Sequence, residues 1–474
     1  MKEQNHDKKS FPVLPAVFAG LLLAVSAVYA GGFLYYQSHF LPGTQIDGID
    51  VSGMTTEELG EQIRDYLLCI AERKADGSVL EEDIQGKEIG LGYVSEEPIR
   101  EILREQNRYQ WFLPQTENHR TEGLIAWDEE KMERKIDGLQ GFTEGFATAP
   151  TDAYISEYMP EEGFTIVPET QGNELDRDRT GEAVREAVAA LAQRLDLEEA
   201  GCYRTPSVTS EDENLQQILK QLLQYTDFQI TYTFGEHTEV LDGETVSSWL
   251  STDGTEVKLD ESQVEAFVVS LRKRYDSIFR PRTFMTSYGK EVTIKEGDYG
   301  WWMNYTREIQ ELSEMIRRGE SGERTPVYYQ TAARYGKPDY GDTYVEINLT
   351  AQHLFLYKDG NLILESDFVS GSSVRGDDTP PGVYGITYKQ RNATLVNEDY
   401  ETPVSYWMPF NRNIGLHDAG WRRTFGGTIY KTNGSHGCVN LPPSAAREIY
   451  ENVQKGTAVI CYQLPGTEAA VMEK

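Results

Sequence analysis

The hydrophobic pattern changes character along the chain. No residue is charged from Phe11 to Tyr36, a length that crosses the roughly 30 Å core of a bilayer as a helix. The middle of the chain repeats apolar residues at helical spacing. The C-terminal part alternates them as strands do, for example at Val345, Ile347 and Leu349. The pattern predicts an apolar N-terminal helix, a middle of helices and strands, and a C-terminal part made mostly of strands.

The N-terminal apolar run is expected to anchor the chain in a membrane. Residues 1–10 are polar and contain three lysines, and acidic sequence follows residue 36. The positive-inside tendency therefore places a tail of residues 1–10 in the cytoplasm and everything after the span 11–36 outside. A cleavable signal peptide is the alternative, because Val28-Tyr29-Ala30 resembles a cleavage site. The apolar run continues past that site, beyond the length of a signal core, which favours an uncleaved single-pass anchor.

The middle of the chain contains an internal repeat. Asp128-Glu129 and Asp260-Glu261 each open a helical pattern. The other matched pairs, with the first copy named first, are Thr165-Ile166 and Thr293-Ile294, Gly172 and Gly300, the helices 180–191 and 306–316, and Arg204-Thr205-Pro206 and Arg324-Thr325-Pro326. Two copies of a strand-and-helix module are therefore predicted. Before them, a helix is expected to begin near Thr55, whose hydroxyl can cap it.

Breaker residues separate the repeats from the C-terminal strands. The segment 335–342 is rich in glycine, proline and aspartate, which is typical of a linker. After it, Asp359-Gly360 marks the turn of a hairpin, and Thr379-Pro380-Pro381-Gly382 is a turn that leads into another strand. The expected body is a β-sandwich-like sheet with few helices. A short helix near its end is predicted from the spacing of Ala446, Ile449, Tyr450 and Val453.

Composition narrows the class of protein. The length of 474 residues suggests about three domains. The chain has 45 basic and 77 acidic residues and a net charge of −32, which repels nucleic acid. A hydrophobic content of 39% excludes low-complexity disorder. We therefore expect a folded multidomain protein that does not bind nucleic acid.

The cysteines indicate no metal site and no disulfide framework. They lie far apart, at Cys69, Cys202, Cys438 and Cys461, without a CxxC pair or a Cys/His cluster at metal-ligand spacing. The sequence does not decide whether one disulfide bridge forms among them. Cys461 lies in an apolar run typical of a buried strand, where a cysteine packs as a small hydrophobic residue.

Cys438 differs from the others, because it lies in Ser435-His436-Gly437-Cys438-Val439-Asn440. A second histidine, His417, precedes this segment with 17 residues (418–434) in between. A free thiol titrates near 8.5, so thiolate chemistry at neutral pH needs an adjacent base or cation. The pattern predicts a cysteine nucleophile with a histidine base, and by itself leaves open which histidine serves.

This motif resembles the signature of the L,D-transpeptidase catalytic domain, the YkuD-type fold of bacterial cell-wall enzymes. The resemblance covers residues 342–465. The segments 37–210 and 211–335 resemble extracellular peptidoglycan-binding modules of Gram-positive bacteria. The implied fold class is multidomain α+β, with a transmembrane helix, two repeated α+β modules and a C-terminal, mostly-β catalytic domain. A rigid spacer that holds the catalytic domain away from the membrane is the alternative role of the modules.

The resemblance also implies roles for single residues. Cys438 would be the nucleophile and His417 its base, with the imidazole oriented by the backbone carbonyl of Asp418. The backbone N–H groups of Gly437 and Cys438 would stabilise the oxyanion. His436 would add a donor or brace the loop.

The surroundings of the motif complete the expected site. Ser435 and Asn440 are expected to fix the catalytic loop by hydrogen bonds, with Asn440 bordering the substrate. Aromatic and arginine side chains near His417 suit a peptide that carries a carboxylate, although core or surface packing is equally open. These flanking residues are Trp407, Trp421, Arg422 and Arg423.

The reaction implied by the resemblance is acyl transfer on peptidoglycan. The thiolate would attack the third residue of a stem peptide, the terminal D-alanine would leave, and an amine of a neighbouring stem would resolve the thioester into a 3-3 cross-link. The expected partners are stem peptides and glycan strands, and no cofactor or metal is expected. Carbapenems would acylate Cys438. The expected location is the cell membrane, with the catalytic domain extracellular in the cell wall, where cross-linking would support wall biogenesis and cell shape.

Other functions remain open. Water could resolve the thioester, which would make the protein an L,D-carboxypeptidase. A wall-binding scaffold with a silent catalytic domain is disfavoured by the intact His417, Gly437 and Cys438, and a general cysteine protease lacks its accompanying signature. In the modules, Trp301-Trp302 could stack on sugar rings, although adjacent aromatics in a strand usually divide between core and surface.

Overall fold

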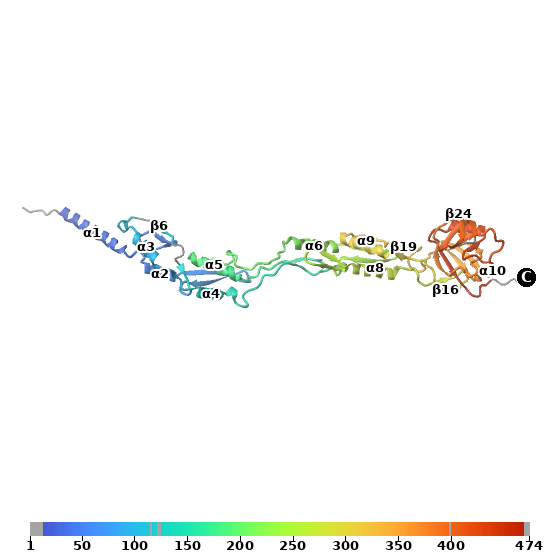
Figure 1. The fold of residues 1–474 in the computed structure, drawn as a ribbon, viewed down its shortest axis with the longest axis horizontal. Helices are drawn as coiled ribbons and strands as arrows, with labels where there is room; N and C mark the ends of the chain where they lie inside the picture. Colours follow the sequence, from blue (N-terminus) through green and yellow to red (C-terminus); the bar gives the residue numbers. More distant parts are fainter. Residues whose placement is uncertain (1–12, 114–115, 121–124, 398–399, 469–474) are drawn as a thin grey trace, which may run out of the picture. The chain divides into compact units, whose positions relative to one another are not determined.

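The structure is a computed structural model that describes residues 13–113, 116–120, 125–397 and 400–468. The chain forms two compact units, drawn in Figure 1. The first contains residues up to 154 together with 166–212, and the second contains 155–165 together with 213–474. Each unit combines helices with small sheets, which confirms the predicted multidomain α+β class.

The first unit contains most elements up to residue 212, and β8 crosses the division between the units. Its helices are α1 (Val13–Tyr35), α2 (Thr56–Arg64), α3 (Glu97–Glu105), α4 (Glu129–Asp137) and α5 (Arg177–Ala189), with short 3-10 helices η1 (Arg108–Gln110) and η2 (Gln140–Phe142). Its strands are β1 (Thr44–Ile46), β2 (Ile49–Asp50), β3 (Leu67–Arg73), β4 (Val79–Gln85), β5 (Gly92–Tyr93), β6 (Glu117–His119), β7 (Ile125–Ala126), β8 (Tyr154–Ile155), β9 (Ile166–Val167) and β10 (Arg194–Asp196).

The second unit contains the remaining elements. Its helices are α6 (Glu213–Thr226), α7 (Gly243–Ser247), α8 (Glu261–Tyr275), α9 (Tyr305–Arg318), α10 (Ile429–Asn433) and α11 (Pro443–Asn452). The strands before residue 335 are β11 (Gln229–Phe234), β12 (His237–Asp242), β13 (Leu250–Thr252), β14 (Val257–Leu259), β15 (Arg282–Met285), β16 (Glu291–Ile294), β17 (Trp302–Met303), β18 (Gly322–Arg324) and β19 (Tyr328–Gln330). The later strands are β20 (Tyr344–Asn348), β21 (His353–Lys358), β22 (Asn361–Asp367), β23 (Gly382–Gly385), β24 (Gln390–Asn397), β25 (Tyr400–Asn411), β26 (Ile414–Asp418), β27 (Val439–Leu441) and β28 (Ala458–Tyr462).

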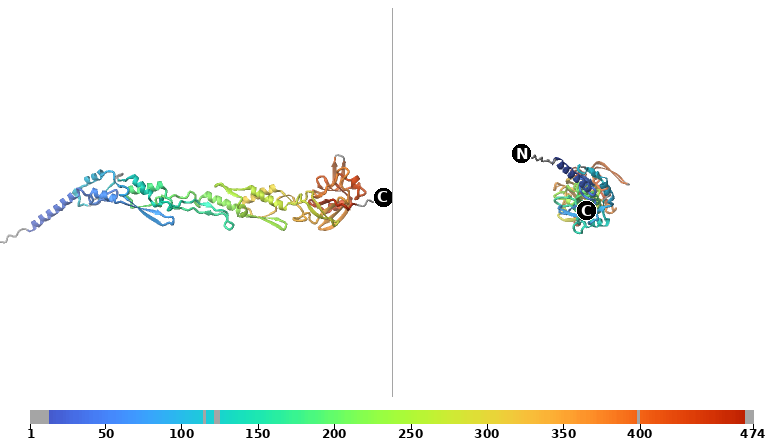
Figure 2. Two further views of the ribbon diagram at one scale, coloured as in Figure 1. Left: turned by 90° about the horizontal axis from the view of Figure 1, so that it is seen from below. Right: turned by 90° about the vertical axis from the view of Figure 1, so that its left-hand side faces the viewer.

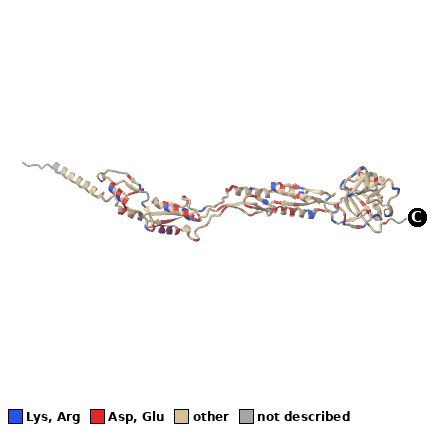
Figure 3. Cartoon of the chain, viewed as in Figure 1, with Lys and Arg blue, Asp and Glu red and all other residues tan. Residues whose placement is uncertain are grey.

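Helix α1 carries no charged residue, as Figure 3 shows, whereas acidic residues are spread over both units. Its segment Val17–Tyr35 is long and apolar enough to cross a membrane, and within the described residues it alone meets that test. A single such helix near the N-terminus fits either a membrane anchor or a signal sequence. The lysine-containing tail of residues 1–10 lies outside the described residues.

The two predicted module copies share one order of elements. A hairpin (β3–β4 or β11–β12) is followed by a helix (α4 or α8), a second hairpin (β8–β9 or β15–β16), another helix (α5 or α9), and a strand parallel to the first (β10 or β18). The helices α4 and α8 begin where the sequence predicts, because Asp128 and Asp260 accept from backbone N–H groups of the first turn. Helix α2 likewise starts after Thr55, which forms a capping box with Glu58.

The register of the repeat differs from the prediction at its end. The last strands of the copies, β10 and β18, occupy the same place beside β3 and β11, so Asp196 corresponds to Arg324. The expected match of Arg204 with Arg324 is therefore shifted by one loop. The predicted match relied on the identical Arg-Thr-Pro tripeptides, whereas the pairing of strands in the sheet fixes the register.

The second module and the C-terminal strands share a core. Phe284 and Ile294 of the β15–β16 hairpin pack with Val383, Ile460 and Tyr462. Backbone hydrogen bonds add to this contact. Tyr299 N–H donates to the carbonyl of Val383, and Val383 N–H donates to the carbonyl of Glu296. The predicted linker 335–342 is thus a packed connection, which is consistent with its place inside the second unit.

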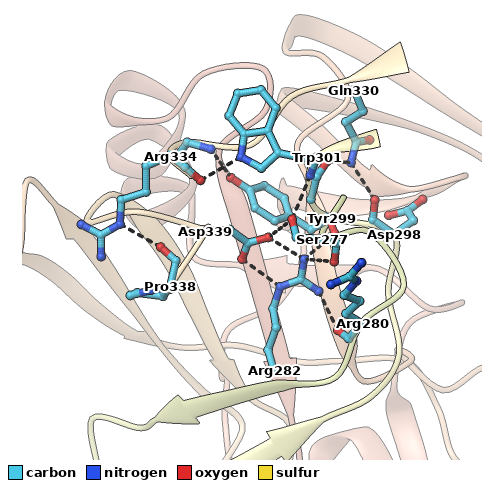
Figure 4. A network of polar contacts seen from close by, with 12 residues as sticks. Ser277, Arg280, Arg282, Asp298, Tyr299, Trp301, Gln330, Arg334, Pro338 and Asp339 are labelled. Atoms are coloured by element: carbon cyan, nitrogen blue, oxygen red, sulfur yellow. Dashed lines mark hydrogen bonds and ion pairs between the residues drawn. The ribbon is translucent and has the colours of Figure 1, made fainter. Parts of the chain in front are cut away.

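A buried ion pair fixes this connection (Figure 4). Arg282 donates from Nε and Nη2 to the two carboxylate oxygens of Asp339 at 2.9 and 2.7 Å, and both side chains are buried. The same guanidinium donates to the backbone carbonyls of Ser277 and Tyr299. A two-pronged arginine–carboxylate contact of this kind sets geometry as well as attraction. It ties the loop after α8 to the segment that enters the C-terminal strands.

The C-terminal strands form two sheets around one core, as the sequence predicts. The five-stranded sheet has the order β22-β21-β20-β28-β23, and the four-stranded sheet has the order β24-β25-β26-β27. Leu356 of the first sheet and Met408 and Leu416 of the second share a cluster with Ile449 of α11. Strands β24 and β25 form a long hairpin that projects from this body (Figure 2). The Asp359-Gly360 turn joins β21 and β22, with both residues at positive φ, as expected for this hairpin.

The polar face of strand β20 is also buried, which the alternating pattern does not predict. Glu346 is fully buried and accepts from Ser287 N–H and from the hydroxyls of Ser287 and Tyr462. Ser287 belongs to the turn between β15 and β16, so the second module covers this face. The alternation of apolar and polar residues gives no sign of this burial, because the covering hairpin lies far away in sequence.

Candidate active site

Two neighbouring parallel strands bring the motif residues together. His417 of β26 lies opposite Asn440 of β27, and Cys438 precedes Asn440 by two residues. Side chains two apart on an extended segment point to one face, and directly paired residues share that face. Gly415 lies two residues before His417, at the level of Cys438, and a Cβ there would lie 2.6 Å from the ring of Trp407. The sequence thus places the imidazole, the amide and the thiol on one side of the sheet.

His417 is buried and held at both ring nitrogens. Its Nδ1 lies 2.9 Å from the backbone oxygen of Asp418, and its Nε2 lies 2.9 Å from the side-chain nitrogen of Asn440. The carbonyl accepts only, so Nδ1 carries the proton and Nε2 accepts from the amide. Burial is the main cause that lowers the pKa of His417, opposed by its hydrogen bond to Asp418. The ring is therefore a neutral imidazole with a lone pair on Nε2.

Arg422 determines which way the amide of Asn440 faces. Its Nε donates to Oδ1 of Asn440 at 3.0 Å, and its Nη1 donates to the backbone oxygen of Asn433 at 2.8 Å. Because a guanidinium only donates, the amide oxygen must face Arg422 and the amide nitrogen must face His417. The structure places this arginine behind the amide, in contact with polar groups of the site itself.

The thiol of Cys438 is buried and protonated. Its Sγ donates to the backbone oxygen of Asn413 at 3.5 Å. Burial raises the pKa of Cys438 to about 11, partly offset by the backbone N–H of Gly415. Among the described hydrogen bonds, none joins this thiol to His417. The resting pair is therefore two neutral groups on one face, rather than a thiolate–imidazolium ion pair.

Side-chain hydroxyls that donate to backbone carbonyls hold the loop around Cys438 in place. The Ser435 hydroxyl donates to the carbonyl of Cys438, and the Thr379 hydroxyl donates to the carbonyl of Gly437 at 2.7 Å. Gly437 has φ +107°, a conformation that favours glycine. An added Cβ would lie 3.1 Å from Cδ1 of Ile414. The loop is thus fixed by hydroxyl donors and by close packing at its glycine.

The other predicted residues take separate places. Trp407 and Trp421 flank the ring of His417, with centroids 5.9 and 6.0 Å away, and Trp421 is 53% exposed. The carboxylate of Asp418 is buried and accepts from Tyr406 N–H. His436 and Arg423 are exposed as well.

Several residues of the site carry no signal in the sequence. Asn413 contacts the thiol only because a hairpin turn between β25 and β26 brings its carbonyl there. Thr379 reaches Gly437 across 58 residues. Arg375 donates to the carbonyls of Gly434 and Ser435. Each lies in a turn, and only the Thr379 turn matched the resemblance.

The cysteines and metal-ligating groups add no further centre. All four cysteines are free, and Cys461 is fully buried in β28, as predicted for a small hydrophobic residue. In the part of the chain that the structure describes, no group of three or more histidine, cysteine, aspartate or glutamate side chains is placed to hold a metal ion.

Two protein families match the chain. The family described as "L,D-transpeptidase catalytic domain" (YkuD) matches residues 342–461. The family described as "Putative peptidoglycan binding domain" matches residues 83–196 and 208–324, so the internal repeat is confirmed. The end of each match, at 196 and 324, agrees with the register of β10 and β18.

Known L,D-transpeptidases are similar to the chain. The crystal structure of a cysteine-to-serine mutant of Enterococcus faecium L,D-transpeptidase is 34% identical, with 52% of this chain and 100% of that chain covered and a TM-score of 0.43. The NMR structure of the E. faecium catalytic domain acylated by ertapenem is 45% identical, with 26% and 98% covered and a TM-score of 0.24. L,D-transpeptidase 2 of Mycobacterium tuberculosis (strain CDC 1551 / Oshkosh) is 28% identical over 102 residues, which span 22% of this chain and 23% of that protein.

This combination of domains defines a protein of bacterial cell-wall metabolism. The family matches and the identity over the full length of the E. faecium chain show that the protein belongs to the L,D-transpeptidases. It carries a YkuD catalytic domain preceded by two copies of a peptidoglycan-binding domain.

Proposed function

We propose that the protein is a cell-wall L,D-transpeptidase that forms 3-3 cross-links through a thioester on Cys438. The observation that carries this proposal is the neutral, Nδ1-protonated imidazole of His417, whose Nε2 accepts only from the amide of Asn440 and whose ring shares one face of the sheet with the thiol. A buried thiol that stays protonated at rest needs such a base when it attacks.

The acylation step uses the two neutral groups together. The thiol leaves its contact with Asn413, and Nε2 of His417 gives up its hydrogen bond from Asn440 and takes the thiol proton. The sulfur bonds to the carbonyl carbon of the third stem residue. The carbonyl electron pair moves onto oxygen, where the N–H groups of Gly437 and Cys438 stabilise it. The intermediate then expels the amine of the terminal D-alanine, which takes the proton from His417. A thioester and free D-alanine remain.

The second step restores the enzyme. An amine of a neighbouring stem attacks the thioester and gives one proton to His417, and the sulfur leaves and recovers that proton. Asn440 favours the second half of each step, because its N–H faces Nε2 and makes the imidazolium unfavourable once it has formed. The proton is therefore passed on to the leaving group rather than kept. In the same sense, Arg422 acts through Asn440 as a positioning residue.

The remaining parts of the chain suit a substrate outside the membrane. The apolar helix α1 acts as an uncleaved anchor, with the modules 37–210 and 211–335 and the catalytic domain 342–465 in the wall. The exposed ring of Trp421 beside His417 borders the stem peptide. The peptidoglycan-binding domains hold the wall polymer near the site. Stem peptides and glycan strands are the proposed partners.

The decisive experiment mixes the full chain with a purified disaccharide-tetrapeptide and follows the products by mass spectrometry. We expect a dimer whose mass equals that of two monomers minus one free D-alanine, and no such product from Cys438→Ala. Trimmed tripeptide without dimer would show that water resolves the thioester, as in a carboxypeptidase. Absence of any product together with absence of acylation by ertapenem, which acylates the E. faecium catalytic domain, would refute the catalytic proposal.

A further inference from the structure

The second module presents an aromatic cluster that the catalytic site does not use. Phe279 is 64% exposed and Tyr329 is 54% exposed. The ring of Trp302 joins them, edge-on to Phe279 at 6.3 Å and tilted against Tyr329 at 4.9 Å. We name Phe279, Trp302 and Tyr329 the aromatic platform. Large rings gathered on a surface mark a contact site more often than scattered apolar residues do.

The backbone at Phe279 is strained in order to hold its ring outward. Its φ is +57°, a left-handed conformation that is rare for a bulky side chain. Arg282 holds both sides of this residue, because it donates to the carbonyls of Ser277 and Arg280 while paired with Asp339 (Figure 4). Local strain that the surroundings enforce in this way is typical of binding sites.

The platform borders a cavity whose wall includes a residue in contact with the thiol of Cys438. Phe279 lines a cavity of about 770 Å³ together with Lys295, Asp298, Tyr384 and Asn413. Asn413 is the residue whose carbonyl accepts from the thiol of Cys438. The cavity has the size of a small-molecule site, and its wall combines aromatic and polar groups. A ligand on the platform would therefore extend from the second module to the edge of the active site.

The two tryptophans divide between core and surface. Trp301 stacks on Tyr335 at 3.9 Å, and its indole nitrogen donates to the carbonyl of Arg334, so this ring belongs to the packed connection. Trp302 belongs to the platform. The first module has Glu174 at the position of Trp302 when Gly172 is matched with Gly300. The platform is thus a property of the second copy.

We propose that this platform binds a glycan strand of peptidoglycan, with sugar rings stacked on Phe279, Trp302 and Tyr329. This inference rests on the proposed function, since it names the polymer held beside the cross-linking site. Aromatic faces suit the C–H faces of a pyranose, and the polar cavity wall suits its hydroxyl and acetamido groups.

The test measures binding of the full chain, in detergent micelles, to peptide-free chains of alternating N-acetylglucosamine and N-acetylmuramic acid. Phe279→Gly removes the ring and relieves the strained backbone, so the variant keeps or gains thermal stability. We expect its affinity, and that of Tyr329→Ala, to fall about tenfold, the scale of a lost aromatic contact. Tyr154→Ala, which removes an equally exposed ring (57%) from the first module, should bind as the wild type does.

Further readouts separate this proposal from the proposed function. Acylation of Cys438 by ertapenem should be unchanged in Phe279→Gly, because the small probe does not reach the platform. Equal glycan affinity of the wild type, Phe279→Gly and Tyr329→Ala would overturn the platform, as would a wild type that does not bind these chains. Glycan binding that depends on Phe279 in a protein that forms no cross-links would support the platform and refute the transpeptidase proposal alone.

Discussion

The side-chain nitrogen of Asn440 lies 2.9 Å from Nε2 of His417, while its oxygen accepts from Arg422 at 3.0 Å. The arginine fixes the orientation of the amide, and the amide fixes the protonation state of the imidazole. A protonated Nε2 would face a second N–H group. Burial, the largest cause, and the charge of Arg422 lower the pKa of His417 in the same direction. The site thus holds its base neutral before substrate arrives.

Replacing Asn440 by aspartate should reverse this effect. In Asn440→Asp a carboxylate faces Nε2 and accepts from it, which favours the imidazolium and raises the pKa of His417, by about 1–3 units for a close opposite charge. Since His417 acts as a base only when unprotonated, the acid limb of the acylation rate should move to higher pH. The measurement is the rate of ertapenem acylation of Cys438 across pH 5–9, followed by mass spectrometry.

The control for this variant is Asn361→Asp on β22, which adds the same charge at an exposed position. Its acid limb should coincide with that of the wild type. An unshifted limb in Asn440→Asp would show that Asn440 does not set the protonation of His417.

The thiol should react slowly with reagents that need a preformed thiolate. Burial raises the pKa of Cys438 to about 11, so about one molecule in 10⁴ is ionised at pH 7. Alkylation of Cys438 by iodoacetamide should rise about tenfold for each pH unit up to about pH 11. Peptide mass spectrometry distinguishes this site from the half-exposed Cys69.

Acylation should behave differently, because in the proposed mechanism His417 removes the proton during attack. His417→Ala should slow ertapenem acylation by about 10²–10⁴-fold, the usual contribution of a general base, while the alkylation profile of Cys438 remains in place. Fast alkylation of the wild type at pH 7, lost in His417→Ala, would instead show a resting ion pair.

The sequence predicts those parts of the site that lie in one short segment. Cys438, Gly437 and Asn440 follow from the motif, and the resemblance adds His417. The hydrogen bond from Arg422 to Asn440 could not be predicted, because it depends on the parallel register of β26 and β27. The contact of Thr379 with Gly437 depends in the same way on how two distant turns meet. Local chemistry is visible in a sequence, and contacts between elements are not.

The fold shows the same division. The hairpin at Asp359-Gly360 follows from turn chemistry within a few residues, and it forms as predicted. The burial of Glu346 does not, since the covering hairpin β15–β16 belongs to the preceding module. The register of the repeat likewise depends on the pairing of β10 with β3 and of β18 with β11, and the identical tripeptides in the sequence predicted a different register.

The glycine of the catalytic loop should be irreplaceable for activity. Gly437→Ala forces a side chain onto φ +107° and brings Cβ to 3.1 Å from Ile414. The loop must shift, and the two N–H groups proposed to hold the oxyanion shift with it. We expect ertapenem acylation to fall by about 10²–10³-fold, the usual effect of losing one oxyanion donor. Acylation kinetics measure the loss of activity, and near-UV circular dichroism measures the change in packing around the loop.

A matched control exists in the hairpin turn. Gly360 also has positive φ, +79°, but its Cβ would meet no atom within 4 Å. Gly360→Ala therefore adds comparable backbone strain, of about 1–2 kcal/mol, away from the site. Equal loss of acylation in both variants would mean that general destabilisation, rather than loop geometry, explains the effect.

A buried carboxyl in the first module should make its stability depend on pH. Glu72 of β3 is 1% exposed, one oxygen accepts from Gly141 N–H at 2.8 Å, and the other has no partner among the described contacts. Burial, and then the neighbouring Glu82, raise the pKa of Glu72 to about 8. The folded protein therefore keeps a proton that the unfolded chain releases near pH 4.5. Because the folded state binds more protons in this window, the free energy of unfolding should fall as pH rises from about 4.5 to 8.

Glu72→Gln should remove this dependence. The amide keeps an acceptor for Gly141 N–H and carries no charge at any pH, so calorimetry of the full chain should show a first-unit transition that changes less between pH 5 and 9. At pH 9 the variant should melt higher than the wild type, by about 2–4 °C for each kcal/mol of stability regained. Glu61→Gln, at an exposed position of α2, is the control and should follow the wild type. Parallel curves for wild type and Glu72→Gln would show that Glu72 is ionised in the folded state at neutral pH, with its charge met by groups other than Gly141.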